Sequence, residues 1–198
     1  MIRSLELFSG TGGLALGLHK AGFVPAALIE WDEKSCNNIN ANISNGNKDV
    51  TGWKVHKTDI RDVTFTDFGT DIQFVTGGPP CQPFSIGGKH KSNRDSRDMF
   101  PEAIRAVREI QPQGFIFENV RGLLRKSFSE YFNYILLQLS HPEIVAHDGI
   151  DWVTHFKLLN EYNDSRANKS LEYNVVFKLM NAADYGVAKK RETDLKAV

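Results

Sequence analysis

The 198-residue sequence lacks an excess of charge of either sign, since lysine plus arginine number 24 and aspartate plus glutamate also number 24. A strongly basic chain is attracted to nucleic acid over much of its surface, and this balance excludes binding of that general kind. Any contact with nucleic acid must therefore depend on a local cluster of basic residues.

Cysteines and long apolar runs are also scarce. Cys36 and Cys81 are too few for a disulfide framework, and such a count is typical of a reducing compartment. No apolar run reaches the roughly 18 residues of a membrane helix, and the N-terminal residues have no signal-peptide core. We therefore expect a cytoplasmic protein with no membrane segment.

Strand-like and helix-like segments alternate along the chain. Residues 2–8 are predicted to form a buried strand, and a glycine-rich turn connects them to a helix that ends at Gly22. Further strands are predicted at residues 24–30, 53–57, 72–78, 114–120 and 173–182, and further helices at residues 32–43, 98–110, 127–139 and 152–162. Because parallel crossovers pass over the faces of a sheet, the expected fold class is α/β, with a doubly wound, mostly parallel sheet.

The expected organisation is one domain over residues 1–198, because 41% of the residues are hydrophobic, enough for one packed core. Residues 141–170 are more polar and irregular than their surroundings and are interpreted as an insertion. The tail after Tyr185 shows no pattern of a complete helix or strand, so no element is predicted there.

The glycine-rich turn after the first strand is a candidate ligand site. Gly10, Gly12 and Gly13 lie in this turn, and Glu30 closes the next strand at the spacing of about 20 residues expected for a carboxylate that binds ribose. This pattern is weak evidence by itself. A packed turn without a ligand, a nicotinamide-dependent dehydrogenase and an S-adenosylmethionine-dependent enzyme all remain open.

Two other residues lie where they can complete such a site. Trp31 directly follows Glu30 and is placed to stack on an adenine ring, although it can equally cover the end of a strand. Asp59 follows the third strand, where its carboxylate can accept a hydrogen bond from an adenine amino group. An ordinary exposed turn aspartate is the alternative for this position.

Cys81 is the candidate nucleophile. It lies in the segment GGPPCQPFS at the end of a predicted strand, where neighbouring prolines prevent a regular helix or an interior strand. Arg94, Arg97 and Lys91 follow it and can favour the thiolate that a nucleophile requires. A lone cysteine is more often a small buried hydrophobic residue. Cys36, which lies in a helical pattern without neighbouring prolines, is assigned no role.

Glu118 ends the next predicted strand, in GFIFENV, so its carboxyl group should emerge at the same edge of the sheet as Cys81. In an apolar pocket its pKa would be raised by loss of hydration, and it could then hold a proton and donate it to a ring nitrogen. Capping the turn after the strand is the alternative role.

Taken in order, the segments FSGTGG, EWD, TDI, GGPPCQPFS, RDMF, ENV and NAADYGV resemble the motifs of the cytosine-C5 DNA methyltransferase family. GGPPCQPFS and ENV are the most specific of these segments. The resemblance covers nearly the whole chain apart from the predicted insertion. It implies a Rossmann-like S-adenosylmethionine-dependent methyltransferase fold, in bacteria often part of a restriction-modification system.

The resemblance also implies roles for individual residues. The cofactor S-adenosylmethionine would be bound by Phe8, Ser9, Gly10, Thr11, Gly12, Gly13, Glu30, Trp31, Asp59, Ile60 and Pro79. Catalysis would be carried by Cys81, Glu118 and Arg191. Contacts with double-stranded DNA would come from Gln82, Ser85, Lys91, Arg94 and Arg97, with basic residues of the loop at 89–97 touching phosphates.

The chemistry implied by the family begins with a cytosine swung out of the DNA duplex. Cys81 would add to C6 of the ring, which activates C5 to accept the methyl group. Glu118 would bond N3 and the exocyclic amine. Loss of the C5 proton and of the thiolate would complete the reaction.

The sequence departs from the family after DYGV. The family pattern P-Q-x-R-x-R is here replaced by residues 188–193, AKKRET, so that Arg191 matches the first arginine and Thr193 replaces the second. The target-recognition region and the last motifs are not found, which indicates a fold incomplete at the C-terminus. Either a second polypeptide supplies the missing half, or the chain is an inactive remnant that binds cofactor or a partner. An RNA cytosine substrate also remains open.

Overall fold

The structure is a computed structural model. It describes the backbone and side chains of residues 1–80, 98–147, 149–164 and 171–187, and the backbone of residues 192–197. The contacts between residues divide the chain into two compact units, which are described separately below.

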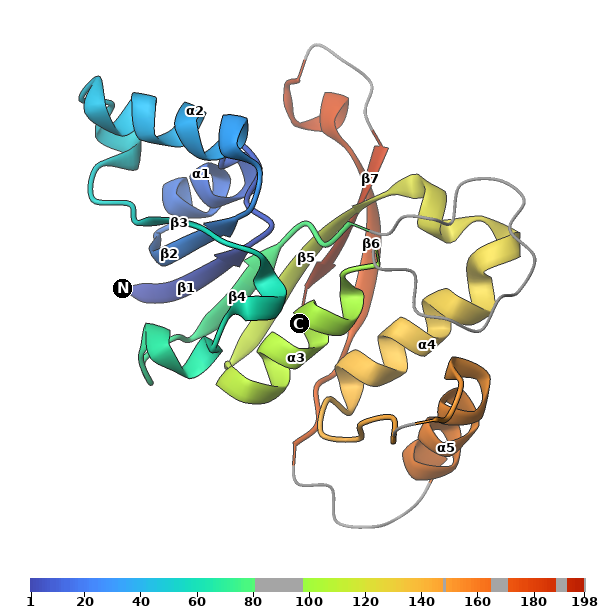
Figure 1. The fold of residues 1–198 in the computed structure, drawn as a ribbon. Helices are drawn as coiled ribbons and strands as arrows, with labels where there is room; N and C mark the ends of the chain where they lie inside the picture. The colour runs from blue at the N-terminus through green and yellow to red at the C-terminus, as the bar shows by residue number, and fades with distance from the viewer. Residues whose placement is uncertain (81–97, 148, 165–170, 188–191, 198) are drawn as a thin grey trace. The chain divides into compact units, whose positions relative to one another are not determined.

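Unit 1 comprises Met1–Pro79 and Glu109–Glu118. Its centre is a parallel sheet in the order β3-β2-β1-β4-β5 (Figure 1). The strands are β1 (Ile2–Leu7), β2 (Phe23–Glu30), β3 (Val55–Lys57), β4 (Phe74–Gly77) and β5 (Gly114–Val120). The predicted α/β class with a mostly parallel sheet is confirmed.

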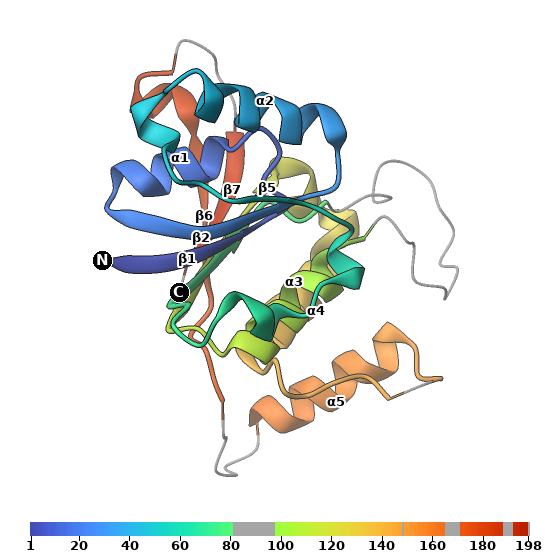
Figure 2. The same cartoon turned by 60° about the vertical axis from the view of Figure 1, so that its left-hand side comes forward.

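Helices α1 (Gly13–Lys20) and α2 (Glu33–Ser44) follow β1 and β2 and cover the same face of this sheet (Figure 2). Helix α1 was predicted from its apolar helical pattern, and α2 was predicted as a polar helix. They enclose a core cluster made by Ala15, Leu28, Ile39, Val50 and Trp53. The central strand β1 is buried from Ser4 to Leu7, as expected for a strand covered on both sides.

The register of the strands aligns their carboxyl ends. Leu7 pairs with Gly77, and Gly77 pairs with Phe117. The next residues along these strands, Phe8, Gly78 and Glu118, therefore lie level with one another at one edge, where β1 and β4 end and β5 continues to Val120. In an open parallel sheet this is the edge where ligands bind.

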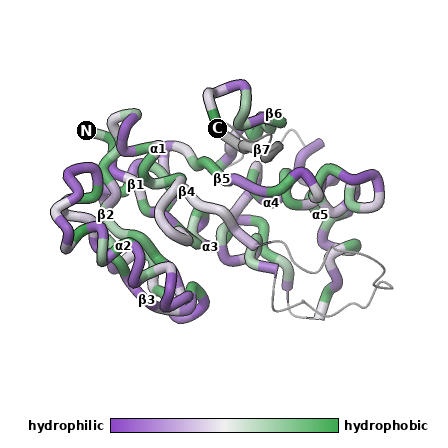
Figure 3. The backbone as a smooth tube through the Cα atoms, turned by 90° about the horizontal axis from the view of Figure 1, so that it is seen from above, coloured by the Kyte–Doolittle hydropathy of each residue, from purple (hydrophilic) through white to green (hydrophobic). Residues whose placement is uncertain are grey.

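Unit 2 comprises Pro80–Arg108 and Asn119–Val198. Its elements are most of α3 (Phe100–Ile110), α4 (Ser129–Ser140), α5 (Trp152–Asp164), β6 (Val176–Asn181) and β7 (Glu192–Ala197). Hydrophilic and hydrophobic residues mix along α5, as in a helix with one apolar side (Figure 3). Of the helices that the structure describes, none is long and apolar enough to cross a membrane.

Aromatic rings hold α4 and α5 together. The ring of Tyr134 lies 5.7 Å from that of Trp152 and 5.6 Å from that of His155, between centroids. Phe132 of α4 packs edge-on against Phe177 of β6 at 5.1 Å. The helix predicted at residues 152–162 is thus part of the packing of unit 2, while its interpretation as an insertion stays a prediction.

The expectation that no element follows Tyr185 is wrong. Glu192–Ala197 forms β7, which pairs antiparallel with β6 from Asn181 opposite Glu192 to Val176 opposite Ala197. The sequence ETDLKA contains one large apolar residue, too few for a strand pattern. Backbone hydrogen bonds to β6 explain why the segment is extended despite its composition.

Candidate active site

The glycine-rich turn between β1 and α1 requires glycine at two positions for conformational reasons. Gly10 and Gly12 have φ of +52° and +84°, values that side chains rarely allow. The Gly12 N–H donates to the Ser9 carbonyl at 2.8 Å, which closes the turn. A Cβ at Gly12 would also lie 3.1 Å from the Trp53 ring. This turn therefore brings backbone close to the sheet edge.

Glu30 holds this turn through its carboxylate. Its Oε2 accepts a hydrogen bond from the Gly10 N–H at 2.7 Å, and its Oε1 accepts from the N–H groups of Trp31 and Asp32, both at 2.9 Å. The residue is 8% exposed. Glu30, which was predicted to bind ribose, thus also has a structural role. Its carboxylate connects the end of β2 to the turn after β1. A carboxylate has about four acceptor sites, so a further hydroxyl donor can be accommodated.

Trp31 lies directly beside this carboxylate and is 70% exposed. If Trp31 covered the end of a strand, its ring would be buried, and this exposure does not fit that alternative. Cys36, in α2, is 2% exposed, and its thiol lies 3.5 Å from the Glu30 carbonyl oxygen. Burial raises the pKa of the Cys36 thiol, which favours a packing role for this cysteine.

Asp59 and Ile60 follow β3, as predicted. The Asp59 carboxylate accepts hydrogen bonds from the Arg61 backbone at 3.0 Å and from Arg61 Nε at 2.9 Å, and these bonds to Arg61 lower its pKa. Ile60 is buried. An adenine amino group that donates to Asp59 would therefore meet a carboxylate that Arg61 already keeps ionised and holds in place.

Gly77 and Gly78 bring β4 against its neighbours at the sheet edge. A Cβ at Gly77 would lie 2.3 Å from the Leu7 carbonyl oxygen, which only glycine avoids. A Cβ at Gly78 would lie 3.6 Å from Glu118 Oε2. The carboxyl group of Glu118 therefore lies beside the backbone that leads through the buried Pro79 towards Cys81.

Several predicted residues lie outside the described part of the chain. These are the catalytic residues Cys81 and Arg191 and the DNA-contacting residues Gln82, Ser85, Lys91, Arg94 and Arg97. The flanking residues are described, and the Met99 N–H donates to the Pro80 carbonyl at 2.9 Å. The roles of these seven residues stay predictions.

Sequence reasoning missed Glu6. This residue lies in the middle of β1, is 1% exposed, and contacts the Thr76 hydroxyl of β4. Burial raises its pKa to about 7. The signal was present, because an acidic residue interrupts the apolar pattern of a strand that was predicted to be buried.

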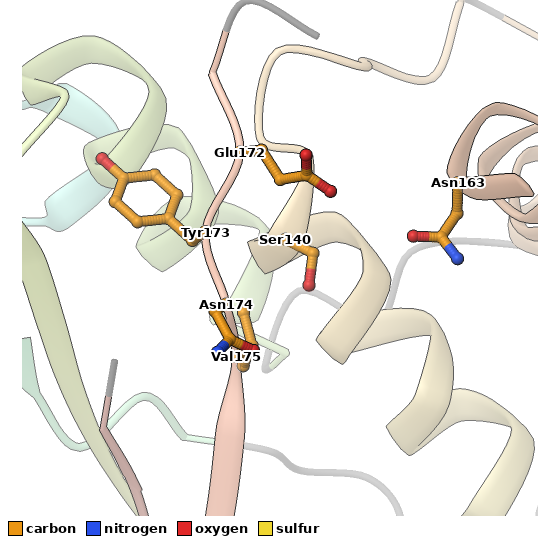
Figure 4. A pocket seen from close by; sticks show the side chains of 6 residues that line it. All are labelled: Ser140, Asn163, Glu172, Tyr173, Asn174 and Val175. Carbon is orange, nitrogen blue, oxygen red and sulfur yellow. The ribbon is translucent and has the colours of Figure 1, made fainter. Parts of the chain in front are cut away.

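A separate pocket lies in unit 2, away from every predicted site residue in the sequence. It is lined by Ser140, Asn163, Glu172, Tyr173, Asn174 and Val175. Figure 4 shows that Ser140 comes from α4, Asn163 from α5 and the others from the chain entering β6. The Tyr173 N–H donates to the Ser140 carbonyl at 2.9 Å, and burial raises the Tyr173 pKa to about 12. This tyrosine is not available as a base near neutral pH.

The sheet edge of unit 1 has features that fit an adenosyl ligand with an amino-acid tail. Ser9 Oγ is buried and has no hydrogen-bond partner among the described residues, so it is free to contact a ligand. The nearby carboxylate of Glu30 and the exposed ring of Trp31 supply a hydroxyl acceptor and a stacking surface. The residues predicted to bind the cofactor are thus suited to S-adenosylmethionine.

Comparison with known proteins gives a family match. The profile of the C-5 cytosine-specific DNA methylase family matches residues 2–143. The type II methyltransferase M.NgoMIV of Neisseria gonorrhoeae is 37% identical over 189 residues, covering 95% of this chain and 48% of the relative. The type II methyltransferase M.AquIA of Picosynechococcus sp. is 32% identical, with 95% of this chain and 68% of the relative covered.

A solved structure supports the fold. A prophage-encoded candidate DNA modification methyltransferase from Escherichia coli superposes with a TM-score of 0.67 at 24% identity. All of this chain and 46% of that protein are covered. The chain thus spans about half the length of several proteins that it matches, such as this one and the Neisseria relative.

Proposed function

The chain belongs to the C-5 cytosine-specific DNA methylase family, and from this premise we propose that it carries the cofactor-binding and catalytic part of an enzyme that transfers a methyl group from S-adenosylmethionine to C5 of cytosine in DNA. The observation that carries the proposal is the position of Glu118. Its carboxyl group lies beside Gly78, three residues before Cys81 and at the same sheet edge as the glycine turn.

Family membership also favours one cofactor. A glycine turn followed by a carboxylate fits both a nicotinamide dinucleotide and S-adenosylmethionine. The family uses the latter, and the unpartnered Ser9 hydroxyl and the exposed Trp31 ring support this assignment. Nicotinamide protection against heat, without protection by S-adenosylmethionine, would restore the dehydrogenase alternative.

We propose the following chemistry for the residues of this chain. The Cys81 thiolate adds to C6 of a flipped-out cytosine, and its electron pair forms the S–C6 bond while the ring π electrons move to C5. Glu118, in its protonated form, donates its proton to N3 and accepts a hydrogen bond from the exocyclic amine, which neutralises the negative charge that develops in the ring; the proton returns to Glu118 when the aromatic ring re-forms. The bound cofactor supplies an electrophilic methyl group to C5. A base then removes the C5 proton, the C5–C6 double bond re-forms, and the thiolate leaves.

We propose that reading of a DNA sequence depends on a region that has no counterpart among these 198 residues, either in a longer form of this protein or in a second polypeptide. The chain covers 48% of the Neisseria relative, and of the family pattern P-Q-x-R-x-R only Arg191 remains within residues 188–193. We therefore expect the isolated chain not to methylate DNA. Transfer of a labelled methyl group to cytosine by the purified chain alone would refute this expectation.

Covalent trapping tests the catalytic proposal. A duplex in which the target cytosine carries fluorine at C5 cannot lose a proton there, so the thioether at C6 persists. We expect an adduct that survives denaturation when the chain, together with the region that reads DNA, is combined with this duplex and S-adenosylmethionine. Cys81→Ala should give none, and Cys36→Ala, in the buried cysteine, should still give it. Trapping through Cys36, or equal trapping by Cys81→Ala, would contradict the assignment.

An RNA substrate is distinguished in the same assay. Matched DNA and RNA duplexes carrying the modified base would be compared, with the expectation of adduct on DNA alone. Adduct on RNA and not on DNA would replace the proposed substrate and leave the roles of Cys81 and Glu118 intact.

A further inference from the structure

A backbone hydrogen bond connects the start of α3 to the residue that precedes the candidate nucleophile. The Met99 N–H donates to the Pro80 carbonyl at 2.9 Å. The carbon of this carbonyl is bonded to the nitrogen of Cys81, so the hydrogen bond acts on the peptide group that leads into Cys81. Groups that fix Met99 therefore also fix the point from which the chain continues to the nucleophile.

Helix α3 holds Met99 through its carbonyl group. The Ala103 N–H donates to the Met99 carbonyl at 3.1 Å, which starts the hydrogen-bond pattern of the helix. Phe100 and Ala103 are buried, so this end of the helix is packed. Met99 is thus bonded to α3 by its carbonyl and to Pro80 by its N–H.

The carboxylate of Asp98 connects the start of α3 to α4. Its Oδ1 accepts a hydrogen bond from the Phe100 N–H at 3.1 Å, one of the N–H groups that have no acceptor inside the helix. Its Oδ2 accepts a hydrogen bond from the hydroxyl of Tyr131, the third residue of α4. Because Asp98 immediately precedes Met99, these two bonds restrain the backbone on the other side of Met99.

Aromatic packing fixes the Tyr131 ring. Its centroid lies 5.8 Å from that of Tyr134 in α4 and 5.6 Å from that of Trp152 in α5. A packed ring has little side-chain freedom left to lose when its hydroxyl makes a hydrogen bond. A hydroxyl that donates to a carboxylate also makes a bond about twice as strong as one between neutral groups. Helices α4 and α5 therefore support Asp98 firmly.

We propose that Asp98 and Tyr131 are positioning residues for Cys81. The Tyr131 hydroxyl fixes Asp98 to α4, and Asp98 and the first turn of α3 together fix Met99. Met99 in turn holds the peptide group that precedes the nucleophile. Addition to C6 of cytosine needs the thiol within a narrow range of distances and directions, and a displacement of about 1 Å can slow such a step about 100-fold. The role of Cys81 is taken from the proposed function, on which this inference rests.

The restraint on Met99 is tested without any ligand, by hydrogen exchange of its amide followed by NMR in the full chain. Tyr131→Phe keeps the ring and removes only the hydroxyl. We expect the Met99 amide to exchange about five-fold faster or more, while the amide of Val107, in the buried middle of α3, keeps its rate. Tyr134→Phe is the matched control, because its hydroxyl contacts His155 of α5, and it should leave Met99 unchanged. An unchanged Met99 rate in Tyr131→Phe would overturn the proposal.

A double variant tests whether the two residues act as one unit. In Asp98→Asn the amide oxygen can still accept from the Phe100 N–H, and the amide nitrogen can donate to the Tyr131 oxygen, but the charge is lost. We expect Met99 to exchange faster than in the unmodified chain and slower than in Tyr131→Phe. The double variant should match Tyr131→Phe alone, because one contact can be lost only once. Effects that multiply in the double variant would show that the residues act separately and would contradict the pairing.

The link to Cys81 is tested by the rate of covalent trapping on the duplex that carries fluorine at C5 of the target cytosine. The chain is used together with the region that reads DNA, with saturating duplex and S-adenosylmethionine. We expect Tyr131→Phe to slow adduct formation about ten-fold or more, and to change the affinities for duplex and S-adenosylhomocysteine by less than about two-fold. Tyr134→Phe should trap at the unmodified rate. Equal trapping rates in Tyr131→Phe and the unmodified protein would overturn the positioning role.

The inference and the proposed function fail in different assays. If the unmodified protein forms no adduct while Tyr131→Phe accelerates Met99 exchange, the nucleophile assigned in the proposed function is contradicted, and the restraint on Met99 is supported. If adduct forms and Met99 exchange does not respond to Tyr131→Phe, the proposed function is supported and the inference is overturned.

Discussion

The two units bury polar groups in different ways. In unit 1, the carboxylate of Glu30 accepts hydrogen bonds from backbone N–H groups in the glycine turn and after β2. In unit 2, His155 meets the Tyr134 hydroxyl at 2.8 Å and His141 meets Asn163 at 2.9 Å, side chain to side chain. A buried carboxylate thus ties together the backbone at the carboxyl edge of the sheet in unit 1, while buried imidazoles join two helices in unit 2.

The substitution with the largest expected effect on stability is Gly77→Ala, in unit 1. The added Cβ would lie 2.3 Å from the Leu7 carbonyl oxygen, so β1 and β4 must separate where the edge of unit 1 is formed. We expect a loss of upwards of about 3 kcal/mol in the free energy of unfolding of unit 1. Hydrogen exchange measured on peptides from β1 and from α4 would report the two units separately.

Gly17→Ala is the matched control for this substitution. Gly17 is exposed within α1, and a Cβ there meets no atom within 4 Å. Removing a helical glycine should stabilise unit 1 by about 0.5 to 1 kcal/mol. Equal effects of the two alanines would show that the close approach at Gly77 does not limit stability.

The second expected difference is that the stabilities of the two units respond to pH in opposite directions. The pKa of Glu6 is raised by burial to about 7 from an ordinary value of 4.5, so its contribution to stability is full below 4.5 and is lost as the pH rises through 7. The loss is on the order of 3 kcal/mol. The pKa of His155 is lowered by burial from 6.5, so its contribution is present above 6.5 and is lost as the pH falls through the lower value.

Acidification from pH 8 to pH 5 should therefore stabilise unit 1 and destabilise the α4–α5 pair. Exchange rates of peptides from the two regions, compared at the two pH values after correction for intrinsic exchange, test this. Glu6→Gln should remove the response of unit 1 only. If the exchange rates of both regions changed in the same direction on acidification, the proposed contrast between the buried carboxyl group and the buried imidazole would be contradicted.

The third test is Glu30→Gln. A glutamine side chain has one acceptor oxygen, and its amide group would face an N–H donor, so it cannot serve Gly10, Trp31 and Asp32 together. We expect unit 1 to lose about 2 kcal/mol of stability by denaturant unfolding and to bind S-adenosylhomocysteine more weakly. Glu33→Gln, at an exposed carboxylate that pairs with Lys57 at 3.4 Å, should cost less than about 0.5 kcal/mol.

The sequence predicted the elements whose pattern is local. Alternating apolar runs located β1, β2, β4 and β5, and helical spacing located α1 to α5. β7 could not be predicted, because ETDLKA is extended only by pairing with β6. Element order and parallel pairing then placed Glu118 at the same edge as the glycine turn.

Contacts of a side chain with groups far away in the sequence could not be predicted from the sequence. Spacing marked Glu30 as a ligand for ribose, yet its bonds to Gly10, Trp31 and Asp32 give it a structural task as well. Glu6 went unnoticed, because its role depends on the approach of Thr76 from a strand 70 residues away. A charged residue inside a strand predicted to be buried is the pattern that would have found it.

The smallest expected change in stability comes from Trp31→Ala, which separates binding from folding. Trp31 is 70% exposed, so its removal should alter unfolding by less than about 0.5 kcal/mol. If its ring stacks on adenine, affinity for S-adenosylhomocysteine should fall about five-fold or more, as stacking of roughly 1 kcal/mol or more requires. Trp152→Ala in unit 2 removes a ring packed against Tyr131 and Tyr134, so it should lower stability and leave affinity unchanged. Unchanged affinity in Trp31→Ala would show that the ring is not part of the adenine site, because its exposure leaves it no packing role to compensate.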